Sequence, residues 1–287
     1  MPSAIPEAEL TDFDRAFNVK RIWERYSEYA GAVRNIPRHR RSFDLYKLQR
    51  MVSAILQAKY LAKKRVKTDE EAKANFLETF FYNYLQNLYG VDTTVVQVAY
   101  DILSSLRLYY DKDPNVKLFA GLMSGTIDDA VWMYVMQFKS IIAIVPISNY
   151  IHFEKLLSSL YPGATVTDID HVIQKYRIKY NTYSKKDVSE FLLRYILSGQ
   201  ELRIMKWQRV LTTKDPEGNG YLEQDSFEDV ALSISPKITR REAGKLFVWT
   251  AEHFQSTVLE IDRLAQMAAA LEASLVVKAI KAEYVFS

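Results

Sequence analysis

Hydrophobic residues recur every three or four positions along most of this chain, which is the spacing of amphipathic helices. One clear example is the stripe formed by Phe76, Phe80, Tyr84 and Leu88. Short polar connections separate these stretches, and their lengths are typical of a compact helical bundle. The pattern predicts an all-α fold, with a multi-helix bundle followed by a helix–loop–helix pair and a long C-terminal helix.

Helix-start signals place several of these elements. Thr68, followed three residues later by Glu71, forms a capping-box pattern, and so does Thr239 with Glu242. Asp113 before Pro114 predicts an N-cap and a proline in the first helical position. These signals predict where helices begin without indicating how the helices pack.

Chain-breaking residues and changes of pattern predict four segments. They are a basic N-terminal helical segment at 1–67, a helical bundle at 68–146, a helix–loop–helix pair at 147–236 and a long C-terminal helix at 237–287. No proline follows Pro236, so we expect the last segment to be one helix. Its apolar seam is expected to pack on its own domain, with a partner helix as the alternative, and consists of Ile261, Leu264, Ala268, Leu271 and Leu275.

Composition narrows the possible fold class and chemistry further. Only nine glycines and eight prolines, with 48% hydrophobic residues, favour a helical globular protein. The absence of cysteine excludes disulfides, thiolate nucleophiles and cysteine metal sites, and it fits a cytoplasmic protein. No apolar run is long enough to span a membrane, and the first residues do not resemble a secretion signal.

Charge is concentrated between residues 34 and 67. That segment has eleven basic residues against Asp44 alone, for a net charge of +10 in a chain whose total is +3. A solvated helix face and a binding surface for an acidic partner are equally good interpretations. Aromatic residues there have helical spacing, which is more typical of a core than of base stacking, so nucleic acid is disfavoured. The candidate acidic-partner residues are Arg34, Arg38, Arg40, Arg41, Lys63, Lys64, Arg65 and Lys67.

The stretch 215–226 has the ligand pattern of a calcium-binding loop. Oxygen-bearing side chains stand at loop positions 1, 3, 5 and 9, and Gly220 stands at position 6, where the chain must turn sharply. Position 12 departs from the pattern, because Ser226 replaces the bidentate carboxylate that completes the coordination. The candidate ligands are Asp215, Glu217, Asn219, the Tyr221 carbonyl and Glu223.

This loop resembles those of the EF-hand superfamily, and the resemblance implies a helix pair around it that binds Ca²⁺ weakly or not at all. EF-hands usually occur in pairs whose loops exchange a short β-bridge. We therefore expect a second hand without ligands in the helix, loop and helix of residues 147–180, where a Thr-Val-Thr run favours a strand.

Residues 76–138 are similar to helical segments of flagellar and ciliary EF-hand proteins, through Tyr84, Tyr89-Gly90 and the run 117–122. This resemblance implies a structural or adaptor protein of a microtubule-based assembly, with tubulin or other axonemal proteins as partners. The alternative is a calcium sensor that binds Ca²⁺ at 215–226 and regulates a partner.

Patterns that would indicate catalysis are missing from the sequence. The four histidines, at 39, 152, 171 and 253, have no metal-binding spacing, and there is no nucleophile elbow or phosphate-binding glycine loop. Acidic pairs such as Asp128/Asp129 occupy helix-start positions, where negative charge is favourable. We predict that the protein is not an enzyme and has no cofactor other than weakly bound Ca²⁺.

Overall fold

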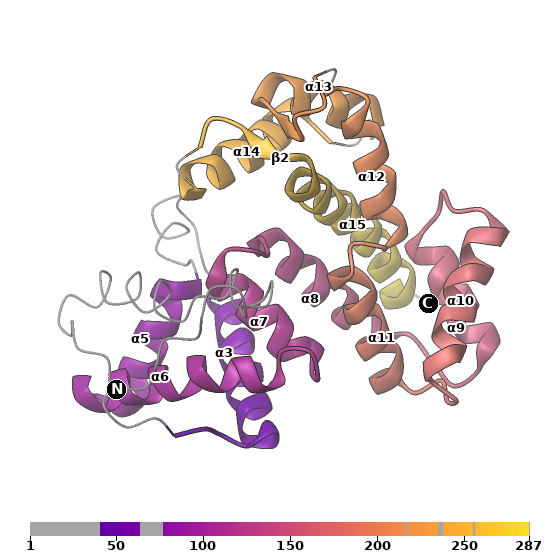
Figure 1. Ribbon diagram of the computed structural model, residues 1–287. Coiled ribbons are helices and arrows are strands. Elements are labelled where there is room, and N and C mark those ends of the chain that lie inside the picture. Colours follow the sequence, from indigo (N-terminus) through magenta and orange to yellow (C-terminus); the bar gives the residue numbers. More distant parts are fainter. Residues whose placement is uncertain (1–40, 64–76, 216, 235–237, 255, 287) are drawn as a thin grey trace. The chain divides into compact units, whose positions relative to one another are not determined.

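The computed structural model describes residues 41–63, 77–215, 217–234, 238–254 and 256–286. The chain divides into two compact units, residues 1–127 (unit 1) and 128–287 (unit 2). In the described residues of both units, the regular secondary structure is helical apart from one short two-stranded sheet (Figure 1). The predicted all-α, multi-helix class is confirmed.

Unit 1 contains α3 (Leu45–Lys63), α5 (Leu77–Tyr89), α6 (Asp92–Tyr109) and α7 (Pro114–Ser124). These helices bury a shared apolar core that includes Val52, Phe81, Ile102 and Phe119. The chain entering α3 is fastened to α6, because the buried Asp101 side chain accepts a hydrogen bond from the Arg41 backbone N–H at 2.9 Å.

The predicted cap of α7 is confirmed. Asp113 Oδ1 accepts hydrogen bonds from the backbone N–H groups of Asn115 and Val116, both at 2.9 Å, and Pro114 takes the first helical position. Asp113 also accepts a hydrogen bond from the Gln49 side chain of α3, at 2.6 Å. One carboxylate thus begins α7 and joins it to α3. The capping box predicted at Thr68 lies outside the described residues.

Unit 2 begins with α8 (Asp129–Ile144) and continues through α9 (Tyr150–Leu160), α10 (Val166–Lys179) and α11 (Lys185–Leu197). The next elements are α12 (Leu202–Thr212), β1 (Tyr221–Leu222) and α13 (Gln224–Ile234). The last are α14 (Arg240–Phe254), β2 (Leu259–Glu260) and α15 (Ile261–Phe286). Helix α15 packs along α8 and α12, and its small residues Ala268, Ala269 and Ala270 are all buried.

Helix α15 packs on its own domain, and Ile261, Leu264 and Ala268 of the predicted seam are buried. Its other two residues, Leu271 and Leu275, are only half-buried. The prediction of one continuous helix over 237–287 is wrong, because the chain leaves α14 after Phe254 and forms β2 before α15 begins. Ser256 favours this break: its Oγ donates to the Val258 carbonyl at 2.6 Å and accepts from the Val258 N–H at 3.3 Å. Such local side-chain hydrogen bonds compete with helical ones.

The predicted pairing of the 147–180 loop with the 215–226 loop is also wrong. In the described structure β1 pairs with β2, and residues 161–165 form a turn that leads into α10. Thr165 caps α10 through reciprocal hydrogen bonds with Asp168, so the helix begins at Val166. The cap uses the hydrogen-bonding groups that a strand would need. The predicted boundary at 146/147 also differs from the division between the units, since α8 belongs to unit 2.

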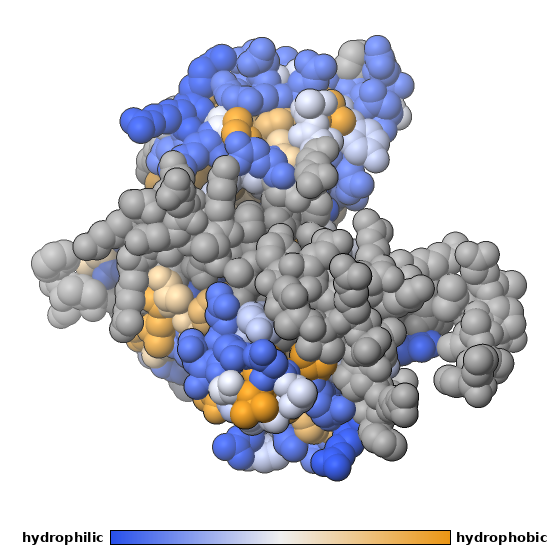
Figure 2. All heavy atoms as spheres, turned by 90° about the vertical axis from the view of Figure 1, so that its left-hand side faces the viewer, coloured by the Kyte–Doolittle hydropathy of each residue, from blue (hydrophilic) through white to orange (hydrophobic). Residues whose placement is uncertain are grey.

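Figure 2 shows one face, on which hydrophobic side chains occur at separate points among hydrophilic ones. Three neighbouring apolar residues, Leu88, Tyr89 and Val91, are exposed at the α5–α6 turn. Among the helices of the described chain, none is both long and apolar enough to cross a bilayer.

Candidate functional site: the loop at 215–226 and its surroundings

The candidate metal loop lies between α12 and α13, as the sequence predicts. Trp207 and Leu211, eight and four residues before Asp215, are fully buried on the inner face of α12. After the loop, Phe227 and Val230 are fully buried on α13. These four side chains fix the loop between two helices anchored in the core of unit 2.

Within the loop, side chains are hydrogen-bonded to the loop's own backbone. Asp215 accepts from the N–H of Gly220 at 2.7 Å and from the N–H of Asn219 at 3.2 Å. Asn219 Oδ1 accepts from the N–H of Tyr221 at 2.9 Å. Gly220 has a φ of +81°, in the left-handed region that favours glycine. The loop therefore has a defined turn, in which Asp215 is the main acceptor.

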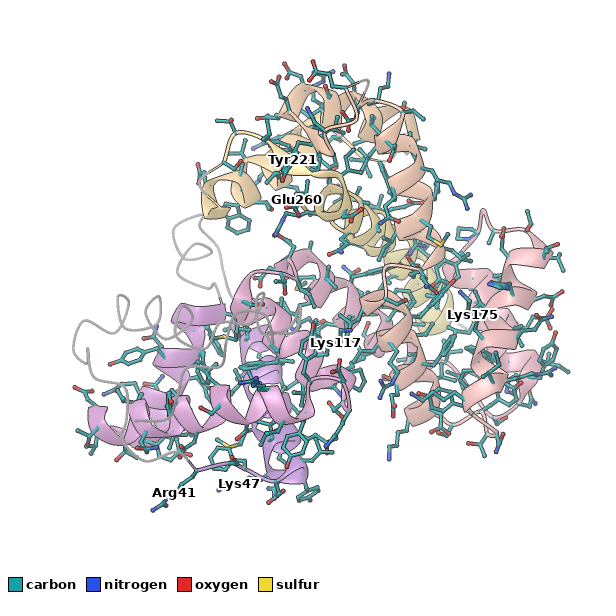
Figure 3. All side chains as sticks on the ribbon, viewed as in Figure 1. Arg41, Lys47, Lys117, Lys175, Tyr221 and Glu260 are labelled. Atoms are coloured by element: carbon teal, nitrogen blue, oxygen red, sulfur yellow. The ribbon has the colours of Figure 1, made fainter. Side chains whose placement is uncertain are left out.

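The loop continues into a short antiparallel sheet. Tyr221 pairs with Glu260 and Leu222 pairs with Leu259 (Figure 3). The Ile261 N–H also donates to the Gly220 carbonyl, at 2.9 Å. Leu222 and Leu259 are buried, whereas Tyr221 is 45% exposed. The partner of the 215–226 loop is consequently the connection between α14 and α15.

The predicted ligands Asp215, Glu217, Asn219, Tyr221 and Glu223 are thus brought into one loop. Ser226 is half-buried in the first turn of α13. Among the described residues, no three acidic, histidine or cysteine side chains lie together in an arrangement that could hold a metal ion.

A buried polar network lies at the start of α12. Glu201 accepts from the Tyr134 hydroxyl at 2.6 Å and from the Ile204 N–H at 2.9 Å, the latter as the N-cap of α12. Arg203 donates to the Tyr134 hydroxyl at 2.8 Å and to the Leu160 carbonyl. Burial, together with the negative charge of Glu201, raises the pKa of Tyr134 well above its usual value.

This network extends to α15. Trp207 Nε1 donates to Glu272 Oε2 at 2.8 Å, and Arg203 Nε lies 3.9 Å from Glu272 Oε1. It therefore connects α8, the end of α9, α12 and α15. Sequence reasoning missed it because Tyr134 and Glu201 are 67 residues apart, and no local pattern marks either residue as buried.

The predicted acidic-partner surface is described only in part. Arg41 is exposed, and Lys63 is the last residue of α3. Lys47 and Arg50 are also exposed on α3, and Lys47 Nζ lies 4.2 Å from the centre of the Phe43 ring (Figure 3). Lys59, in contrast, is fully buried, so it does not contribute to a solvated basic face. The other predicted residues lie outside the described part, namely Arg34, Arg38, Arg40, Lys64, Arg65 and Lys67.

No family model, no curated protein and no solved structure matches this chain. Its function therefore has to be inferred from its own residues and their geometry.

Proposed function

We propose that the segment from α12 to α15 is an EF-hand-like pair with a structural role, and that the protein is a non-catalytic adaptor of a microtubule-based assembly such as a cilium or flagellum. The observation that carries the proposal is the 215–226 loop, which combines a calcium-loop turn with Ser226 at its closing position. Such a loop keeps the shape of a hand without the ligand that completes coordination.

The pairing of β1 with β2 supports the same proposal. Two helix–loop–helix segments joined through their loops form one module with four helices, and each loop stabilises the other. The Asp215 carboxylate is already satisfied by two backbone N–H groups. The pair then acts as a preformed scaffold whose helices contact other polypeptides, and it does not depend on an ion to reach that shape.

The basic segment supplies the proposed contact with the cytoskeleton. Between residues 34 and 67 it has a net charge of +10, and the exposed Arg41, Lys47 and Arg50 belong to it. A concentrated positive charge attracts acidic surfaces at a distance, and the acidic tails of tubulin are the partner that this proposal names. The proposed location is the cytoplasmic cytoskeleton, in particular the axoneme.

Calorimetric titration with calcium tests the proposed hand. The wild-type protein should give no signal up to millimolar Ca²⁺, whereas Ser226→Glu should bind, because glutamate completes the oxygen ligands at position 12. Ser226→Gln is the matched control, since it has the same length without the charge. Binding by the wild type at micromolar Ca²⁺ would instead support the calcium-sensor alternative. The absence of a calorimetric signal from Ser226→Glu would contradict the equivalence of this loop to an EF-hand loop.

Co-sedimentation with microtubules tests the proposed partner. Reversing the charges of Arg38, Arg40, Lys63 and Lys64 to glutamate should abolish salt-sensitive binding. The control reverses four exposed lysines of unit 2, Lys155, Lys179, Lys186 and Lys214, which produces the same change in net charge. Equal loss in both variants, or no loss in either, would contradict a specific role for the basic segment.

A further inference from the structure

The β1–β2 register relates the two helix–loop–helix segments residue by residue. Leu222 faces Leu259, so an approximate two-fold axis between them makes these two leucines equivalent. The other pair in the sheet agrees with this symmetry. Tyr221, one residue before Leu222, lies opposite Glu260, one residue after Leu259. Helix α13 begins two residues after Leu222, and α15 begins two residues after Leu259. Both segments therefore leave the sheet in the same way.

Burial in the exit helices supports this equivalence independently. Phe227, five residues after its leucine, is fully buried, and so is Leu264 at the same offset. The next two offsets, eight and nine residues after each leucine, are also buried in both helices. They are Val230 and Ala231 in α13, and Met267 and Ala268 in α15.

The equivalence identifies the residue that closes the second loop. Ser226 is four residues after Leu222, and the residue four positions after Leu259 is Arg263. A calcium-binding loop needs a carboxylate at this position. The second loop instead has a permanently charged guanidinium there, which repels a divalent cation.

Arg263 has an acidic neighbour in α8. Its Nη1 atom lies 3.8 Å from Asp128 Oδ2, and the two side chains are only 15% and 10% exposed. Asp128 is also the N-cap of α8, where its Oδ1 accepts from the Ala130 N–H at 2.7 Å. A single carboxylate therefore begins α8 and pairs with the closing residue of the second loop.

We propose that α14–β2–α15 is a metal-independent second hand, in which Arg263 replaces the closing acid and fastens α8 against α15 through Asp128. Helix α8 then occupies the α15 surface permanently, as a ligand helix supplied by the chain itself. Trp132, Val135 and Phe138 of α8 are buried in agreement with such a role. The description of this segment as a hand rests on the proposed function. The ion pair between Arg263 and Asp128, which we call the latch, does not.

Hydrogen–deuterium exchange of the full-length protein tests the latch. Arg263→Gln and Asp128→Asn should each make the first turns of α8 exchange about tenfold faster, since each removes the opposite charge from one side of this ion pair. Asparagine keeps the N-cap acceptor, so the effect of Asp128→Asn reports the lost charge. The double variant should exchange no faster than the faster single one, and Arg263→Lys should keep most of the protection.

Two outcomes would overturn the proposal. One is a double variant in which the two single effects multiply, which would show that Arg263 and Asp128 act separately. The other is a wild-type protein whose α8 becomes better protected on addition of 1 mM CaCl₂, which would show that the position of α8 depends on the metal. The first outcome leaves the Ser226→Glu titration unaffected, so the latch can fail while the proposed function survives. The second outcome would also contradict the expected silence of the wild type in that titration.

Discussion

Replacing Glu201 by alanine should destabilise unit 2 more than almost any other single polar substitution. Glu201 is fully buried and accepts two hydrogen bonds, one from the Tyr134 hydroxyl and one from the Ile204 N–H. Arg203, with 4% exposure, donates to the same Tyr134 hydroxyl and would keep its charge in the same region. Its ion pair is with Glu272, at 3.9 Å.

The magnitude follows from these contacts. Loss of an N-cap costs about 1 kcal/mol, and leaving a buried hydroxyl without its charged acceptor costs roughly 1–3 kcal/mol. We therefore expect Glu201→Ala to lower the free energy of unfolding by about 3 kcal/mol. Glu201→Gln keeps the shape and an acceptor, and should cost about 2 kcal/mol.

Urea unfolding followed by tryptophan emission measures this effect, since Trp132 and Trp207 are buried in unit 2. The control is Glu190→Ala, which removes a half-exposed ion pair with Arg194 at 3.1 Å and should cost less than about 1 kcal/mol. A Glu201→Ala variant within about 1 kcal/mol of wild type would refute the reasoning. The double variant Glu201→Met/Arg203→Met gives a second test, because removal of both charges should lower the free energy of unfolding by less than the sum of the two single losses. A loss equal to that sum would also refute the reasoning.

Two further predictions concern packing and pH. Gly244→Ala should cost about 1 kcal/mol in the same assay, because the new Cβ would lie 2.4 Å from Oε1 of the buried Glu228 and the gain in helix propensity offsets part of the overpacking. The Glu228 carboxylate cannot move freely, since Gln224 and Arg240 hold it at 2.7 and 3.4 Å. Gly163→Ala meets nothing within 4 Å and should be nearly neutral. Hydrogen bonds from Thr182 and Ser184 lower the pKa of Asp187, so this carboxylate stabilises the fold above its unfolded pKa of about 4 and loses that contribution as the pH falls below it. The Tm difference between wild type and Asp187→Asn should therefore shrink between pH 7 and pH 3, and a constant difference would contradict the assignment.

Local chemistry made part of this structure predictable. The caps at Asp113 and Thr239 were visible in the sequence, because each begins its helix through hydrogen bonds that span only two or three residues. The 215–226 loop was visible for the same reason, since its turn depends on Gly220 and on nearby side-chain oxygens.

The partner of that loop could not be predicted in this way. The connection between α14 and α15 has no glycine and no pattern of acidic residues, and Arg263 stands where a ligand would be expected. Its role became apparent only through the register between Leu222 and Leu259, which are 37 positions apart.

The sequence by itself determined the helical class, some of the helix starts and one calcium-loop-like turn, because these depend on spacing and on contacts between near neighbours. Only the tertiary structure decided which loops pair, that α8 covers α15, and that Glu201, Tyr134 and Arg203 meet in the interior. Those contacts join residues far apart in the chain, and their energy depends on burial, which no local pattern of residues specifies.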